Sequence, residues 1–255
     1  MNLTLKILFL LTAIGQFFVP VLPQMGIGET IGDRAVAEGI PPELPPGLFF
    51  SIWGIIFLGL FVLAVRNLVA SDHAIERVSL PLTLAAFGNL VWMWSAQSLG
   101  LVWLDFMLLL PIAFCTWWAA HRQDRLARYD GTLTRILIGL TTGLYAGWLT
   151  VAVSISVPDL GRWLLAHGVT DAVWQSLWMA LVPAVVMAFV FANYISRNFW
   201  YFVALGWGLL GIVVNNWTRT GTGWLAIITA VVALYVLFRR IRFGARGSYP
   251  DKLST

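Results

Sequence analysis

Charge is scarce in this sequence. Asp, Glu, Lys and Arg make up 11% of the 255 residues, whereas apolar types make up 59%. Soluble globular chains carry about 25% charged residues, so the composition excludes an ordinary soluble domain. The net charge of +4 gives no basis for a nucleic-acid partner, because membrane topology explains where the basic residues fall. We therefore expect an integral membrane protein whose surroundings are the lipid bilayer.

Cysteine and the common catalytic motifs are also lacking. Cys115 is the only cysteine, which excludes a disulfide within the chain and a cysteine-based metal cluster. His73, His121 and His167 fall in or beside predicted loops, and no spacing is typical of a hydrolase triad, a zinc site or a phosphate loop. His121, at the end of the fourth apolar run, is a candidate axial haem ligand. We predict no catalytic residue, no metal site and no required cofactor.

Long uncharged runs recur along the whole chain. Runs of about 17 to 25 apolar residues are long enough to cross a bilayer as a helix. A cleaved signal peptide is the competing interpretation of the first run, but no small-residue cleavage site follows before Pro20 and Pro23. The sequence predicts an all-α protein with eight spans, Leu3–Leu22, Leu48–Val69, Ser79–Gln97, Leu101–Ala119, Ile136–Val157, Ala172–Tyr194, Phe199–Val214 and Thr222–Phe238.

The basic residues divide unequally between the two predicted faces. With eight spans, the face that holds both termini carries thirteen of the sixteen lysines and arginines. The other face carries only Arg34, Arg162 and Arg219. Loops rich in lysine and arginine stay in the cytoplasm. Both termini are therefore predicted to be cytoplasmic.

Two connections on the predicted outer face are long. Residues 23–47 contain Glu29, Asp33, Glu38 and Glu43 with a single Arg34. Residues 158–171 read "PDLGRWLLAHGVTD", whose middle, "RWLLAH", would fit a short interfacial helix. These segments either build a vestibule on the outer face or are solvated connectors.

Asp105 is the one acid clearly inside a predicted span. A charge at this depth costs about 3 kcal/mol on insertion scales, so it needs partners within the bundle. No lysine or arginine lies close to it in sequence, and the nearby candidates are the neutral Asn89, Trp92 and Gln97. We expect Asp105 to fix the hairpin between the third and fourth spans.

Tryptophan is abundant, with fourteen copies. Many fall at the predicted membrane boundaries, as in an aromatic belt. Six fall within spans, where an indole N–H needs a partner. These six form bundle core or line a pocket for a flat, apolar ligand, and they are Trp53, Trp92, Trp94, Trp148, Trp178 and Trp207.

Four segments resemble one known family. They are "GETIGDR" from Gly28, "PPGLFFSIWGIIF" from Pro45, "YAGWLTVAVSIS" from Tyr145, and the stretch that carries Asn89, Trp92 and Asp105. Together they resemble the tryptophan-rich sensory proteins, the bacterial relatives of the mitochondrial translocator protein (peripheral benzodiazepine receptor). Leu48, where an aromatic is common, and Ser156, where Asn is common, depart from that pattern.

The resemblance implies a fold and a binding site. Residues 1–157 would form a translocator-protein-like bundle of five helices, followed by three extra helices at 158–240 and a basic tail at 241–255. The implied pocket opens beneath the loop at 23–47 and binds porphyrin, haem or another large apolar molecule. By position in the motifs, its residues would be Phe50, Trp53, Asn89, Trp92, Asp105, Tyr145, Trp148 and Ala152. The family's homodimer is put in doubt, because the extra helices could cover the dimerising face.

The leading hypothesis is a bacterial inner-membrane protein that binds a tetrapyrrole as sensor, carrier or scavenger. The alternatives are a structural or assembly subunit of a larger membrane complex, and an enzyme that degrades bound porphyrin. Nothing in the sequence requires turnover.

Overall fold

The computed structural model is all-helical across the residues it describes, which are 2–30, 32–34, 39–70, 72–125, 132–169 and 171–243. Its main helices are α1 (Leu3–Phe18), α3 (Ile52–Ala70), α4 (His73–Ser98), α5 (Val102–Asp124), α6 (Thr132–Leu165), α7 (Val173–Val190), α8 (Phe199–Thr218) and α9 (Gly223–Phe243). Short 3₁₀ helices, η1 (Val19–Met25) and η2 (Gly47–Ser51), flank the first loop, and the π-helix η3 (Phe191–Ile195) ends α7. The predicted all-α membrane fold is confirmed.

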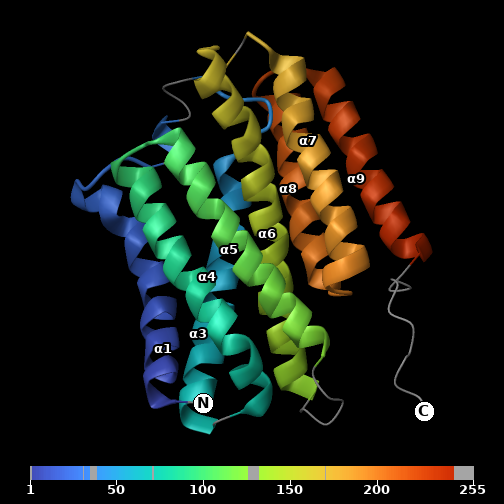
Figure 1. Ribbon diagram of the computed structural model, residues 1–255. Coiled ribbons are helices and arrows are strands. Elements are labelled where there is room, and N and C mark those ends of the chain that lie inside the picture. The colour runs from blue at the N-terminus through green and yellow to red at the C-terminus, as the bar shows by residue number, and fades with distance from the viewer. Residues whose placement is uncertain are drawn as a thin grey trace.

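Seven of these helical segments are long and apolar enough to cross a membrane. They correspond to the first seven predicted spans. The eighth prediction falls on α9, whose described apolar part, Gly223–Phe238, is shorter than the others. Figure 1 shows the start of α1 and the ends of α3 and α5 at one end of the bundle, with the start of η2 toward the other end. This arrangement matches the two faces into which the sequence divides its loops.

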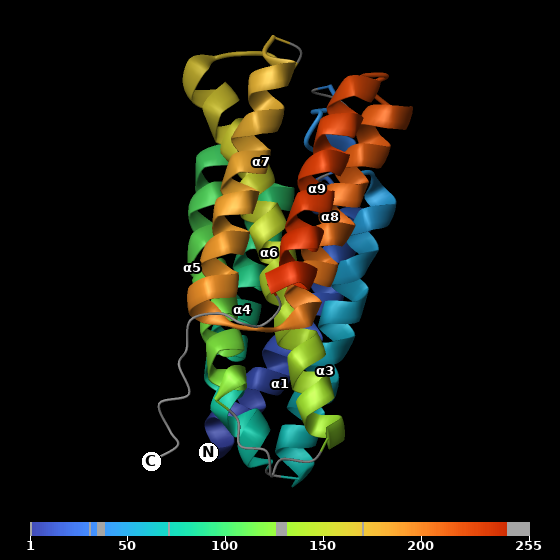
Figure 2. The same ribbon diagram turned by 90° about the vertical axis from the view of Figure 1, so that its right-hand side faces the viewer.

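Helix α6 is the central element of the bundle. It has 34 residues, roughly 50 Å at 1.5 Å per residue, and runs the full height of the molecule (Figure 1). Of its apolar window 83% is buried, against 28% for the spans built on α1, α5 and α7. Helices α3, α4 and α5 contact it, as do α7 and α8, which lie on either side of it in Figure 2.

Helix α6 also extends past its predicted end at Val157. Pro158 lies inside the helix, because a membrane helix tolerates proline where neighbouring groups satisfy the freed carbonyl. The separate interfacial helix expected at 162–167 is therefore wrong, since Arg162 to Leu165 form the last turn of α6. The predicted division of the chain at residue 157 falls within this continuous helix, and as a domain boundary it stays a prediction.

Small residues let α8 approach α6 closely. A Cβ added to Gly147 would lie 2.2 Å from the main-chain oxygen of Tyr201, and one added to Gly208 would lie 2.5 Å from Val151 Cγ2. Close backbone approach of this kind is how helices associate where no water drives them together. The hydroxyl groups of Thr150 and Tyr201 share a hydrogen bond of 3.0 Å across the same contact.

Hydrogen bonds join the helix ends on the predicted cytoplasmic side. His121 Nδ1 donates to the Ile195 carbonyl at 3.0 Å, which ties α5 to the end of η3. Asn198 Oδ1 accepts from the main-chain N–H of Trp200 at 2.9 Å and caps α8, while its Nδ2 donates to the Gly139 carbonyl at 2.7 Å. His121 thus has a structural contact, and haem ligation by it stays a prediction.

Replacing Gly147 by Ala tests the α6–α8 contact. The new methyl group would meet main-chain atoms, so we expect a loss of about 1 to 3 kcal/mol in unfolding free energy from overpacking. Gly206→Ala is the matched control, because a Cβ there meets nothing within 4 Å. Thermal unfolding in detergent should show a lower midpoint for Gly147→Ala only. Equal midpoints for both variants would contradict the close contact.

Candidate functional site

Five of the predicted pocket residues meet in one aromatic cluster around Trp53. The Trp53 ring lies 6.3 Å from that of Trp92, 5.9 Å from that of Tyr145 and 6.4 Å from that of Trp148. Phe50 packs edge-on against Trp148 at 5.6 Å. The cluster therefore joins η2, the start of α3, the C-terminal half of α4 and the middle of α6.

Most of this cluster is core rather than the wall of an open space. Trp148 is 1% exposed and Tyr145 is fully buried, with its hydroxyl donating to the Ala85 carbonyl at 3.0 Å. Asn89 is also fully buried, and its Nδ2 donates to Gln16 Oε1 at 2.7 Å. Ala152 is 7% exposed. Ligand binding by these residues stays a prediction, whereas their packing role is plain.

A cavity of about 550 Å³ lies next to the cluster, toward the predicted outer end of the bundle. Of the eight predicted residues, only Trp92 and Asp105 are among the described residues that line it. The rest of its described wall comes from the ends of α4, α5 and α6 and from the loops after η1 and α6. These lining residues are Arg34, Gly39, Pro41, Glu43, Leu44, Ala96, Gly100, Val102, Ile155, Ser156, Asp159, Arg162, Trp163, Ala166, His167, Gly168 and Val169.

Asp105 fixes the α4–α5 hairpin, but through a different partner from those predicted. Ser95 Oγ donates to Asp105 Oδ1 at 3.1 Å. The expectation that Asn89, Trp92 or Gln97 would bind it is wrong: Asn89 Nδ2 donates to Gln16 Oε1, the Trp92 indole nitrogen has no partner in the described part of the chain, and no described hydrogen bond joins Gln97 to Asp105. The three-residue turn from Leu99 to Leu101 sets Ser95 opposite Asp105.

The loop between η1 and η2 supplies the positive charge that the sequence near Asp105 lacks. Arg34 lines the same cavity as Asp105. Its Nη1 donates to the Ala96 carbonyl at 2.6 Å and its Nη2 to the Gln97 carbonyl at 3.3 Å. The last carbonyls of a helix have no partner within it and carry partial negative charge, so a guanidinium is favoured at the end of α4.

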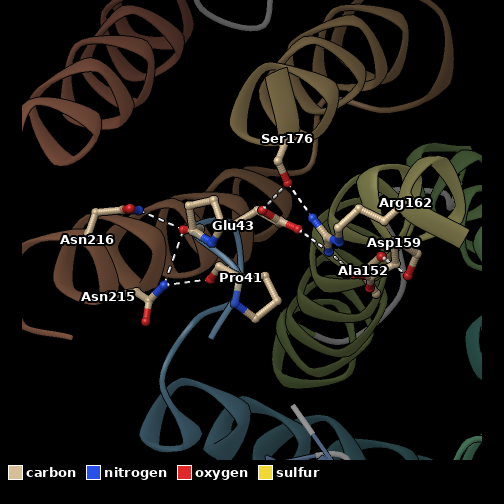
Figure 3. Close-up of polar contacts among 10 residues, drawn as sticks. Pro41, Glu43, Ala152, Asp159, Arg162, Ser176, Asn215 and Asn216 are labelled. Carbon is tan, nitrogen blue, oxygen red and sulfur yellow. Dashed lines mark hydrogen bonds and ion pairs between the residues drawn. The ribbon is translucent and has the colours of Figure 1, made fainter. Parts of the chain in front are cut away.

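Glu43 anchors the loop that forms one wall of the cavity. It is 1% exposed, and it accepts hydrogen bonds from Arg162 Nη2 at 2.7 Å and from Ser176 Oγ at 2.8 Å. Arg162 also donates to Asp159 and to Ser176. Figure 3 shows the Glu43 carboxylate lying between α6 and α7. A carboxylate this deeply buried requires such a partner.

Helix α8 holds the same loop from its other side. Asn215 Nδ2 donates to the Pro41 carbonyl at 2.9 Å, and Asn216 Nδ2 donates to the Pro42 carbonyl at 2.6 Å (Figure 3). Proline has no N–H, so a segment of consecutive prolines cannot form the main-chain hydrogen bonds of a helix or a sheet. Its buried carbonyls therefore need donors from other parts of the chain. We call residues Pro41–Glu43 the anchored segment.

Nothing in the sequence singles out these anchoring residues. Glu43 is one of several acids in its loop, and Arg162 is one of three basic residues on the predicted outer face. The pair Asn215 and Asn216, which follows an apolar run directly, was the available indication of a buried polar contact. Their partners could not be inferred, because Glu43 and Arg162 are 119 positions apart.

The cavity combines apolar and charged walls. Trp92, Val102 and Ile155 offer apolar surface, while Arg34, Asp105 and Asp159 place charged groups around it. Among the described residues, no group of three or more His, Cys, Asp or Glu is arranged to hold a metal ion. Apolar walls with a few polar groups are typical of small-molecule sites in proteins.

Comparison with known families shows where the chain belongs. The family described as TSPO-like protein matches residues 6–240. The chain is a member of the TSPO-like protein family. It is a multi-pass membrane protein, and the family match extends over α7, α8 and most of α9. No curated protein and no solved structure matches the chain at a significant level.

Removing the Glu43 carboxylate tests the anchored segment. Glu43→Ala should lower the unfolding free energy by about 3 to 5 kcal/mol, because Arg162 then keeps a buried charge without its main partner. Glu29→Ala, at an exposed position of the same loop, should change it little. Thermal unfolding in detergent measures both. If the two variants have the same thermal unfolding midpoint, the ion pair does not hold the loop.

Proposed function

We propose that this TSPO-like protein binds a large, mainly apolar small molecule in the cavity at the outer end of the bundle, as a membrane sensor, carrier or scavenger. A tetrapyrrole, porphyrin or haem, is the ligand class that the sequence resemblance implies. The observation that carries the proposal is the cavity of about 550 Å³ between the aromatic cluster and the anchored segment.

The dimensions and position of the cavity support this function. Small-molecule sites enclose about 300 to 1,000 Å³ and combine apolar walls with a few polar groups. This cavity lies where two outer loops meet three helix ends, and Trp92 connects it to the aromatic cluster. A ligand would therefore reach it from the outer face and rest its apolar body against aromatic and aliphatic side chains.

An unused hydrogen-bond donor gives further support. Trp92 lines the cavity, and its buried Nε1 has no acceptor among the described residues. A buried N–H without a partner costs about 1 to 3 kcal/mol, so groups of this kind call for an explanation. A bound molecule with an acceptor atom near Trp92 would supply the missing hydrogen bond.

Filling the cavity tests the proposal. Ser156 lines it and Ser98, at the end of α4, is exposed and does not. With protoporphyrin titrated into purified protein and its absorbance followed, Ser156→Phe should weaken binding by at least about fivefold, since an added ring forces a misfit worth about 1 to 3 kcal/mol. Ser98→Phe should bind as the wild type does. Unchanged binding by Ser156→Phe would remove the cavity as the site.

We also propose that both termini face the cytoplasm of a bacterial cell, with the cavity on the opposite face of the inner membrane. The excess of basic residues on the face with the termini supports this orientation. In a Cys115→Ser background, a cysteine at Asp33 should react with a membrane-impermeant maleimide in spheroplasts, and one at Arg125 should react only after lysis. The reverse pattern would overturn the orientation.

The assembly-subunit and porphyrin-degrading alternatives, and a homodimer, stay predictions. The mass of the particle after gentle solubilisation distinguishes an assembly subunit or a homodimer from a monomeric binding protein, because both would give a larger particle. Loss of porphyrin absorbance over time in a saturated sample distinguishes the second.

A further inference from the structure

Two arginines meet at the end of the α4–α5 hairpin that lies away from the cavity. Arg77 is exposed in the second turn of α4, and Arg122 is half-buried in the last turn of α5. Arg122 Nη1 donates to the main-chain carbonyl of Arg77 at 3.0 Å. The two residues therefore place two positive charges on one part of the surface, and we call them the arginine pair.

A tryptophan orients one member of the arginine pair. The Cζ of Arg122 lies 4.5 Å from the centroid of the Trp118 ring. A guanidinium on an indole face has a planar fork that is already oriented, so it loses little freedom when it binds a further group. Tryptophan is enriched at the level of the lipid headgroups. The arginine pair therefore lies where the headgroups of a bilayer would meet the protein.

The neighbouring carboxylates have other partners. Glu76 Oε1 lies 3.7 Å from Lys6 Nζ, and Asp124 Oδ2 accepts the main-chain N–H of Arg197 at 2.7 Å. In the described part of the chain, no carboxylate forms an ion pair with either member of the arginine pair. A guanidinium has five N–H donors, and the described hydrogen bond of the Arg122 side chain uses one. The arginine pair therefore keeps donors for an anionic group from outside the chain.

Apolar side chains continue from the arginine pair along both helices, which lie side by side (Figure 1). Residues three or four positions apart share one face of a helix. The exposed apolar residues that follow this spacing from Arg77 and Arg122 are Leu80, Leu84 and Phe87 on α4, and Phe114 and Leu110 on α5. We call these five residues the apolar stripes. In a membrane they would face acyl chains.

We propose that the arginine pair and the apolar stripes bind one phospholipid with an anionic headgroup, such as phosphatidylglycerol. Its phosphate accepts hydrogen bonds from Arg77 and Arg122, because arginine and phosphate form strong, charge-assisted hydrogen bonds. Its acyl chains lie along α4 and α5. Phosphatidylcholine binds less well, since its trimethylammonium group is repelled by the arginines. This site is separate from the cavity and does not depend on what the cavity binds.

Native mass spectrometry of the full chain in detergent tests the site. Phosphatidylglycerol and phosphatidylcholine with the same acyl chains are added in steps, and the fraction of protein with one bound lipid gives a dissociation constant for each. The wild type should prefer phosphatidylglycerol at least about fivefold. A hundredfold excess of soluble glycerol 3-phosphate should leave the lipid bound, because it has the phosphate but no acyl chains.

Removing one charge should weaken this preference. Arg77→Gln should lower the affinity for phosphatidylglycerol about fivefold and change that for phosphatidylcholine little. The Arg77 side chain is exposed, so we expect the variant to fold, and its unfolding midpoint in lipid-free detergent checks this. Arg122→Gln should act in the same direction. Arg219→Gln is the matched control, because it removes the same charge from an exposed position at the other end of the bundle.

Three outcomes would overturn the proposal. Equal affinity of the wild type for the two lipids would exclude recognition of the anionic headgroup. An equal loss in Arg77→Gln and Arg219→Gln would show general attraction by charge and no site at the arginine pair. Displacement of the lipid by glycerol 3-phosphate would show a site for a free phosphate. None of these results bears on protoporphyrin binding in the cavity, which Ser156→Phe tests.

Discussion

The buried ion pair between Glu43 and Arg162 is the interaction on which the end of the bundle that holds the cavity depends. It joins a loop near the N-terminus to helices from the second half of the chain. Removing either charge from this contact should cost about 3 to 5 kcal/mol, a large share of the roughly 5 to 15 kcal/mol by which a typical protein is stable. The loop is therefore held against α6 and α7, and the carbonyls of Pro41 and Pro42 are brought to the asparagines of α8. One wall of the cavity is a consequence of this contact.

Helix α6 gives the ion pair its position. It is nearly enclosed by its neighbours, and its last turns carry Ile155, Ser156, Asp159 and Arg162 into the cavity wall. Gly147 lets α8 pack directly on its middle. The C-terminal helices are thus part of the packed bundle, and through α7 and α8 they shape the cavity that the first loop covers.

The site differs in character from the pocket that the resemblance implies. Phe50, Trp53, Tyr145 and Trp148 pack against one another and stabilise the bundle, whereas the open space lies beyond them and has charged groups in its wall. Trp92 belongs to both regions. The cavity wall thus offers aromatic surface at Trp92 and charged groups at Asp105, Asp159 and Arg34.

The sequence by itself determined the membrane class, the helical fold and seven of the eight predicted spans, because apolar runs of bilayer length can satisfy their main-chain groups in lipid only as helices. The ordered motifs also indicated the family, and the lone Asp105 indicated a fixed hairpin. Only the tertiary structure decided that Ser95 binds Asp105, that Arg34 lies beside the same cavity, that α6 continues through Pro158, and that Glu43 meets Arg162. These contacts join side chains far apart in sequence through irregular loops, whose path is set by which buried polar groups find partners rather than by any local periodicity.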